Sequence, residues 1–167
     1  ARRVAEAIGD QPQAAAAAWA TGVVLAAMGN WEEGIVECQH AVQMTRDALS
    51  RAIATGWLGF AYVEQGDATR AIAALEQSLP FLHKFGVRAL EGWFTAFLAE
   101  GYRLEGSLER AEALSLEALQ IATEADSRVA VGWAQQTLGR IARSRSDLET
   151  AATSLTAALE TFTAMKS

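Results

Sequence analysis

Few residues of this sequence are of the types that catalyse reactions or bind metals. The chain of 167 residues contains one cysteine, Cys38, and two histidines, His40 and His83. Residues two apart on a helix point to different faces, so Cys38 and His40 cannot jointly hold a metal ion. The sequence contains no phosphate-binding loop, no Gly-x-Ser-x-Gly and no pair of cysteines. We therefore expect no enzyme activity, no metal and no cofactor, and we expect Cys38 to be packed in the interior.

Arg140 and Arg143 are the side chains best placed to bind an anion. They are three residues apart, so on a helix they share one face and could together hold a carboxylate or a phosphate. The alternative is that they simply belong to a solvated helix face. The formal charge of −6 argues against nucleic-acid binding, for which a basic surface is expected.

The sequence shows no sign of a membrane protein. Its longest apolar run, residues 14–20, is too short to span a bilayer, and no basic region with a cleavage site marks a signal peptide. A single cysteine also excludes a disulfide within the chain. We place the protein in the cytoplasm by default, with no membrane partner.

A repeated pattern determines the expected fold. Gly29, Gly66, Gly106 and Ser146 follow one another at intervals of 37, 40 and 40 residues. Each is followed by a residue suited to begin a helix: Asn30, Asp67, Ser107 and Asp147. A glycine just before such a residue suits the left-handed conformation that ends a helix. The pattern therefore predicts helix A, a tight turn and helix B in each of four copies. Helix A is expected at residues 12–28, 49–65, 88–105 and 128–145, and helix B at 31–46, 68–85, 108–124 and 148–165.

Small residues recur where the two helices of each copy should meet. They stand seven residues before the turn residue, five after it and twelve after it. These positions hold Gly22, Gly34, Ala41; Gly59, Ala71, Ser78; Ala99, Ala111, Ala118; and Gly139, Ala151, Ala158. Two helices approach closely only where the contacting side chains are small.

These residues give the chain a resemblance to the tetratricopeptide repeat (TPR) family. The second copy carries the motif best, with Leu58-Gly59, Tyr62, Gly66-Asp67 and Ala71. The period of about 40 residues resembles a long variety of the family, whose usual period is about 34. The resemblance implies an all-α, right-handed superhelix of about four antiparallel helix-turn-helix repeats. Pro80 lies inside the second helix B, where it should bend the helix or cost it a hydrogen bond.

In this family the inner groove is lined by helix A, which places the expected binding residues. The resemblance implies a partner-binding groove formed by Trp19, Val23, Phe60, Glu64, Trp93, Arg103, Trp133, Arg140 and Arg143. Its first half would be apolar and its second half basic. The alternative for the tryptophans is that they fill space between repeats, an interpretation we favour for Trp57 and leave open for Trp93 and Trp133.

We therefore expect residues 1–167 to form a single TPR-like domain, a fragment of a larger protein, that binds a protein or peptide segment. One alternative is a ligand- or peptide-sensing domain of a bacterial signalling ATPase, cyclase or transcription regulator. Another is self-association, because Leu155, Leu159 and Phe162 would form an uncovered apolar face on the last helix.

Overall fold

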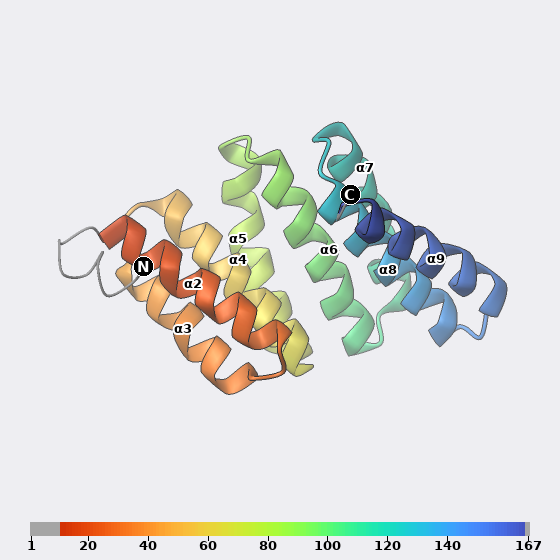
Figure 1. The fold of residues 1–167 in the computed structure, drawn as a ribbon, viewed down its shortest axis with the longest axis horizontal. Coiled ribbons are helices and arrows are strands. Elements are labelled where there is room, and N and C mark those ends of the chain that lie inside the picture. Colours follow the sequence, from red (N-terminus) through yellow and green to blue (C-terminus); the bar gives the residue numbers. More distant parts are fainter. Residues whose placement is uncertain (1–10, 166–167) are drawn as a thin grey trace. The chain divides into compact units, whose positions relative to one another are not determined.

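The computed structural model describes residues 11–165, which are folded into α-helices joined by short connections (Figure 1). In chain order these helices are α2 (Gln11–Ala27), α3 (Trp31–Met44), α4 (Ala48–Gln65), α5 (Ala68–Lys84), α6 (Arg88–Glu105), α7 (Leu108–Glu124), α8 (Arg128–Ser144) and α9 (Leu148–Ala164). No residue in the described range belongs to a β-strand. The predicted all-α fold is confirmed, and every predicted helix boundary lies within two residues of the observed one.

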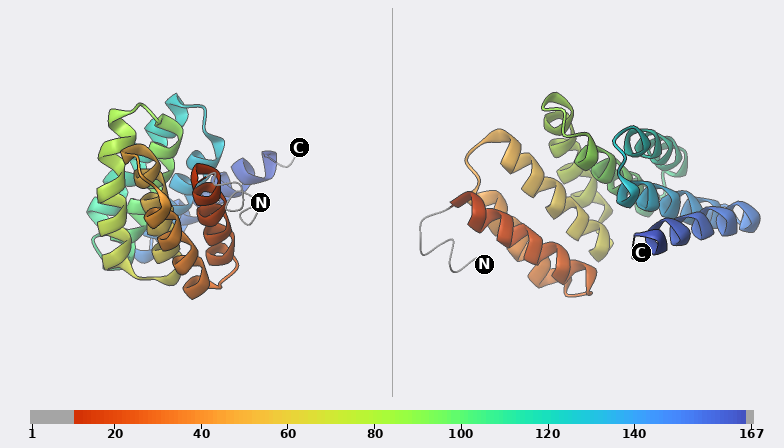
Figure 2. Two further views of the ribbon diagram at one scale, coloured as in Figure 1. Left: turned by 90° about the vertical axis from the view of Figure 1, so that its left-hand side faces the viewer. Right: turned by 45° about the horizontal axis from the view of Figure 1, so that its top comes forward.

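The chain forms two compact units, Ala1–Phe85 and Gly86–Ser167. In the first unit, α2 pairs with α3 and α4 pairs with α5, and α4 also packs against both helices of the preceding pair. In the second unit, α6 pairs with α7 and α8 with α9, and α8 packs against α6 and α7 (Figure 2). Each unit is thus a stack of two helical hairpins. The single domain proposed for residues 1–167 stays a prediction.

The turns within the hairpins have the predicted backbone conformation. Gly29, Gly66 and Gly106 have φ of 89°, 84° and 97°, in the left-handed region that glycine adopts without a Cβ clash. Ser146 takes the same conformation in the fourth hairpin, with φ of 63°. The last hairpin therefore keeps the turn geometry even though its turn residue is not glycine.

The helix starts agree with the sequence only in part. A carboxylate oxygen of Asp67 accepts a hydrogen bond from the backbone N–H of Arg70 at 3.0 Å, and Asp147 caps α9 through Thr150 at 3.1 Å. The predicted caps at Asn30 and Ser107 are wrong, because neither side chain makes a capping hydrogen bond. The Ser107 hydroxyl instead donates to the Glu105 carboxylate at 2.9 Å.

The predicted close contacts within hairpins are confirmed, because several helix glycines have no room for a Cβ atom. A Cβ placed on Gly34 would lie 2.7 Å from the carbonyl oxygen of Gly22, across the α2–α3 contact. A Cβ on Gly59 or on Gly139 would lie 2.6 Å from the Cγ of the leucine facing it in the partner helix. The helix pairs are therefore as close as their smallest residues allow. Pro80 is exposed and α5 continues through it without a break.

Candidate binding sites

The described residues include no group of three or more His, Cys, Asp or Glu side chains that could hold a metal ion. Cys38 is fully buried on α3, as predicted, and its sulfur lies 4.0 Å from the carbonyl oxygen of Trp19. Burial, with a smaller contribution from the charge of Glu37, raises the pKa of the Cys38 thiol to about 12. The thiol is therefore protonated at neutral pH, which makes it a poor nucleophile.

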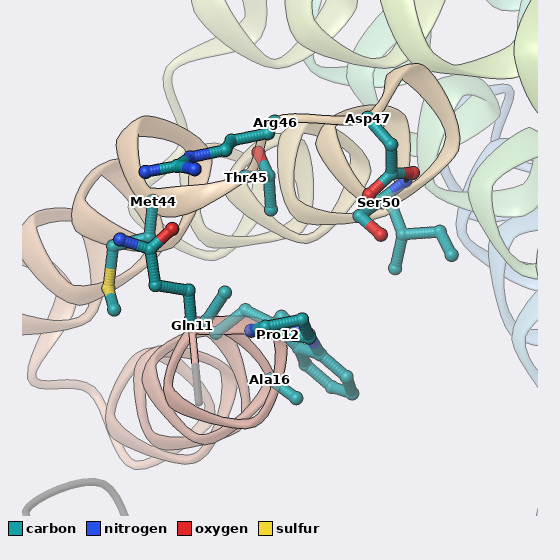
Figure 3. A pocket seen from close by; sticks show the side chains of 11 residues that line it. Gln11, Pro12, Ala16, Met44, Thr45, Arg46, Asp47 and Ser50 are labelled. Carbon is teal, nitrogen blue, oxygen red and sulfur yellow. Dashed lines mark hydrogen bonds between the residues drawn. The ribbon is translucent and has the colours of Figure 1, made fainter. Parts of the chain in front are cut away.

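The first unit contains a cavity of about 310 Å³ between the first half of α2 and the connection from α3 to α4 (Figure 3). Its walls come from three segments of the chain. They are Gln11, Pro12, Ala15, Ala16 and Trp19 of α2; Met44, Thr45, Arg46 and Asp47 at the end of α3 and in the connection; and Ser50 and Ile53 of α4. A volume of about 300 Å³ is at the lower end of the range for small-molecule sites.

The cavity exists because the alanine run in the α2 wall has only small side chains and the opposite wall, the α3–α4 connection, is held in place by hydrogen bonds. On α2 the run of alanines at residues 14–18 has no large side chain to fill the space. On the opposite side the connection is held by three hydrogen bonds. Thr45 Oγ1 donates to the Val42 carbonyl at 2.7 Å, Arg51 Nη2 donates to the Thr45 carbonyl at 2.9 Å, and the Ser50 N–H donates to Asp47 at 2.8 Å. The cavity is thus a preformed feature rather than a loose loop.

The cavity is apolar inside and polar at its rim. Trp19 and Ile53 are half-buried, and the Trp19 ring stacks on Trp57 with centroids 5.4 Å apart. Arg46 and Asp47 carry opposite charges at the rim. The hydrogen bond from the Ser50 backbone holds the pKa of Asp47 below its ordinary value, so its carboxylate is ionised at neutral pH. Such a site suits an apolar group that also bears a hydrogen-bond donor.

A second polar feature lies in the second unit, where Glu100 on α6 is only 4% exposed. Two oxygens of Glu100 accept hydrogen bonds from Arg103 at 2.9 Å each, and Arg140 on α8 donates to the same carboxylate at 2.7 Å. Arg143 lies on the exposed surface of α8. The structure therefore joins Arg103 to Arg140 through Glu100, and it does not make Arg140 and Arg143 a free pair of cations.

Two aromatic residues of the expected groove pack against other aromatic rings. Phe60 is 3% exposed and meets Trp57 edge-on, with centroids 6.3 Å apart. Trp133 meets Phe97 at 5.2 Å and Phe162 at 6.2 Å, both edge-on. The space-filling interpretation thus holds for Trp57, which is 5% exposed, and it extends to Phe60. Trp133 is half-buried, so its contact with a partner stays a prediction.

The other residues expected in the groove are partly accessible. Val23 and Glu64 in the first unit, and Trp93 in the second, are half-buried. The indole N–H of Trp93 donates to the Ser127 hydroxyl at 2.9 Å. Contact of any of these side chains with a partner stays a prediction.

The cavity residues outside helix A were not anticipated from the sequence. Met44 ends helix B, and Arg46 and Asp47 belong to the connection to the next helix A, whereas the family resemblance directed attention to helix A alone. A usable signal was present in the alanine run of α2, because a helix face without large side chains opposite a connection leaves room for a ligand.

Comparison with known proteins supports the fold. No protein-family model matches the sequence, and no curated protein matches it significantly. Among solved structures, the chain is similar to RapI in its apo form, with a TM-score of 0.68 and 15% sequence identity. The match covers 92% of this chain and 57% of RapI, so the chain spans a little over half of that protein's length. At this identity the likeness shows a shared helical-repeat fold, and membership of the TPR family stays a prediction.

Proposed function

We propose that this chain is a non-enzymatic protein-interaction module that binds a segment of a partner polypeptide and acts in regulation. The observation that carries the proposal is the preformed cavity at Trp19, which has an apolar interior and a charged rim. Stacked helical hairpins present such surfaces on a rigid scaffold, and this is the usual way in which repeat proteins function. The similarity to the apo form of RapI supports the helical-repeat scaffold on which the proposal depends.

The cavity also supports the alternative of a small-ligand sensor. An extended partner would contact many positions along the helices, whereas a small ligand needs one enclosed site. The cavity meets the second requirement, and a single side chain of a peptide meets it equally well. The formal charge of −6 favours protein over nucleic acid as the partner. None of the described helices has the length and apolarity needed to cross a bilayer, and we propose a cytoplasmic location.

Self-association is the third candidate, because α9 exposes apolar side chains. Of the three residues expected to be uncovered, Leu159 is 66% exposed, whereas Leu155 and Phe162 are half-buried and face Gly139 and Gly132 of α8. Leu148, at the start of α9, is 71% exposed. Sedimentation of the full chain over a range of concentrations tests this candidate directly. A monomer at every concentration would remove it.

Selection from a random peptide library on the immobilised full chain tests the main proposal. Enriched peptides are then synthesised and titrated by calorimetry against the parent and two variants. Ala16→Leu fills the cavity, whereas Ala27→Leu adds the same side chain to an exposed position about three turns further along the same helix. We expect Ala16→Leu to weaken binding at least about tenfold, through loss of the buried anchor, and Ala27→Leu to leave it unchanged.

The other outcomes are also informative. Peptides that bind both variants like the parent would place the site elsewhere, with Arg143 and its neighbours as the next surface to vary. Failure of every replicate selection to enrich a peptide would refute the proposal that the chain binds polypeptide segments.

A further inference from the structure

One repeat position differs between the hairpins in a way that accounts for the cavity. The residues thirteen positions before the turn residue are Ala16, Ile53, Trp93 and Trp133. The residues one helical turn later, ten positions before the turn residue, are Trp19, Gly56, Ala96 and Gln136. The third and fourth copies thus place a tryptophan at the earlier position. The first copy has alanine there and has its tryptophan one turn further along α2.

The second unit shows where a tryptophan at the earlier position lies. Trp93 on α6 reaches the connection between α7 and α8, where its indole N–H donates to Ser127 Oγ at 2.9 Å. Ser127 is the residue immediately before α8, nineteen positions before its turn residue, Ser146. In this unit, therefore, an indole ring occupies the space beneath the connection between hairpins, with a hydrogen-bond acceptor above its nitrogen.

The first unit has equivalent residues at these two positions but no ring, and its connection follows a helix of 14 residues (α3) rather than 17 (α7). The residue equivalent to Trp93 is Ala16, and the residue equivalent to Ser127 is Asp47, nineteen positions before Gly66 and immediately before α4. Both Ala16 and Asp47 line the cavity (Figure 3). The cavity therefore lies where the indole of a tryptophan at position 16 would be.

The size and chemistry of the cavity fit such a ring. An apolar cavity of roughly 150 Å³ holds benzene, and this one, at about 310 Å³, has room for the larger indole. Asp47 uses one carboxylate oxygen to accept the Ser50 N–H at 2.8 Å. A carboxylate has a second oxygen with acceptor capacity, and an ionised acceptor forms stronger hydrogen bonds than a hydroxyl.

We propose that the cavity binds a tryptophan side chain of the partner segment, with its indole N–H directed to the Asp47 carboxylate. The proposal rests on the proposed function, because it names the anchor of the same site. The ring takes the place that Trp93 has in the second unit, against Trp19 and Ile53. Residues 1–10 of the chain contain no aromatic residue, so this N-terminal segment does not supply the ring.

The test uses the full chain and small probes, so it does not depend on a known partner. The ¹⁵N-labelled protein is titrated with N-acetyl-tryptophanamide, with its 1-methylindole analogue, which lacks the N–H, and with N-acetyl-leucinamide. We expect saturable shifts of the backbone amides of Asp47 and Ser50 and of the Trp19 indole with the first probe. Loss of the donor should weaken binding about three- to tenfold, and leucinamide should bind more weakly still.

Two variants of α2 separate filling of the cavity from a general effect of the added ring. In Ala16→Trp the new indole takes the cavity itself, so probe binding should be lost while the thermal midpoint is kept or raised. Ala27→Trp places the same ring at an exposed position about three helical turns from Ala16, outside the cavity lining, and should bind the probe like the parent. Should Ala16→Trp fail to fold by circular dichroism, Ala16→Leu supplies the filled cavity. Asp47→Asn retains a capping side chain but removes the charge, and should abolish the preference for the probe that carries an N–H.

Three results would overturn the inference: no saturable shifts at the cavity, equal binding of tryptophanamide and leucinamide, or undiminished binding to the filled variants. Its failure is distinguishable from failure of the proposed function. Library peptides that bind at the cavity through another side chain would support the proposed function and refute only the tryptophan anchor. Probe binding without any selected peptide would point to a small aromatic ligand and overturn the polypeptide partner in both proposals.

Discussion

Replacing Gly34 by alanine tests the closeness of α2 and α3 most directly. The added Cβ would lie 2.7 Å from the Gly22 carbonyl oxygen and 2.9 Å from the Ala26 nitrogen. Ordinary contacts of a Cβ begin near 3.4 Å, so the helices would have to separate by roughly half an ångström or more. Both obstructing atoms belong to the backbone, and no flexible side chain can move aside.

The expected loss of stability can be estimated from two opposing effects. Overpacking of this kind costs about 3 kcal/mol, at the upper end of the usual range, because the contact is between backbones. Alanine favours the helix over glycine by about 1 kcal/mol, which offsets part of that cost. We therefore expect Gly34→Ala to lower the free energy of unfolding by about 2 kcal/mol and the thermal midpoint by about 4–8 °C.

Gly92→Ala is the matched control, because its Cβ would meet nothing closer than the Ala122 nitrogen, at 3.3 Å. The gain in helix propensity is the same, so this variant should differ from the parent by less than about 1 kcal/mol. Far-UV circular dichroism melts and urea titrations of both variants provide the comparison. Equal stability of Gly34→Ala and the parent would show that α2 and α3 are not in the close contact described above.

Three further predictions concern single side chains. Ser146→Gly should stabilise the second unit by about 0.5–1 kcal/mol in a urea titration, because glycine adopts the left-handed conformation at φ of 63° without the steric cost that serine has there. The greater entropy of glycine in the unfolded chain offsets part of this gain. A loss of stability would contradict this backbone geometry. Glu100→Ala should lower the free energy of unfolding by about 2–3 kcal/mol in the same assay, because it leaves the guanidinium groups of Arg103 and Arg140 without their carboxylate. The control Glu117→Ala removes an exposed carboxylate and should be neutral. Cys38 should react with a disulfide reagent at pH 8 only as fast as the chain unfolds, since its thiol pKa of about 12 keeps it protonated; rapid labelling of the native chain would show that the thiol is accessible.

The hairpins could be predicted from the sequence because their signals are local. A turn glycine, a polar residue after it and small residues at fixed offsets specify two helices and their contact, whatever the rest of the chain does. The caps at Asn30 and Ser107 failed for a local reason too. Neither side chain satisfies an amide of the helix that follows, and the Ser107 hydroxyl donates to the neighbouring Glu105 carboxylate instead.

The candidate site was harder to predict because it depends on relations between copies. The resemblance assigned function to a stripe along helix A, but Phe60 on that stripe is buried and Arg140 is hydrogen-bonded to Glu100. Whether a position on helix A faces solvent depends on the side chains of the neighbouring hairpin, which no single copy reveals. The cavity involves a connection and a helix that are about thirty residues apart, Ala16 and Asp47.

The cavity also has a thermodynamic consequence that separates a binding site from a packing defect. A large side chain at position 16 would bury apolar surface against Trp19 and Ile53, and burying a tryptophan-sized group typically contributes a few kcal/mol. Alanine leaves that stabilisation unused, as expected of a site kept open for a ligand whose binding restores it. Without ligand, Ala16→Trp should therefore be more stable than the parent. When a tryptophan ligand is added, the stability of the variant should rise by less than that of the parent. If the variant is instead destabilised while still folded, the space is shaped for something other than an indole ring.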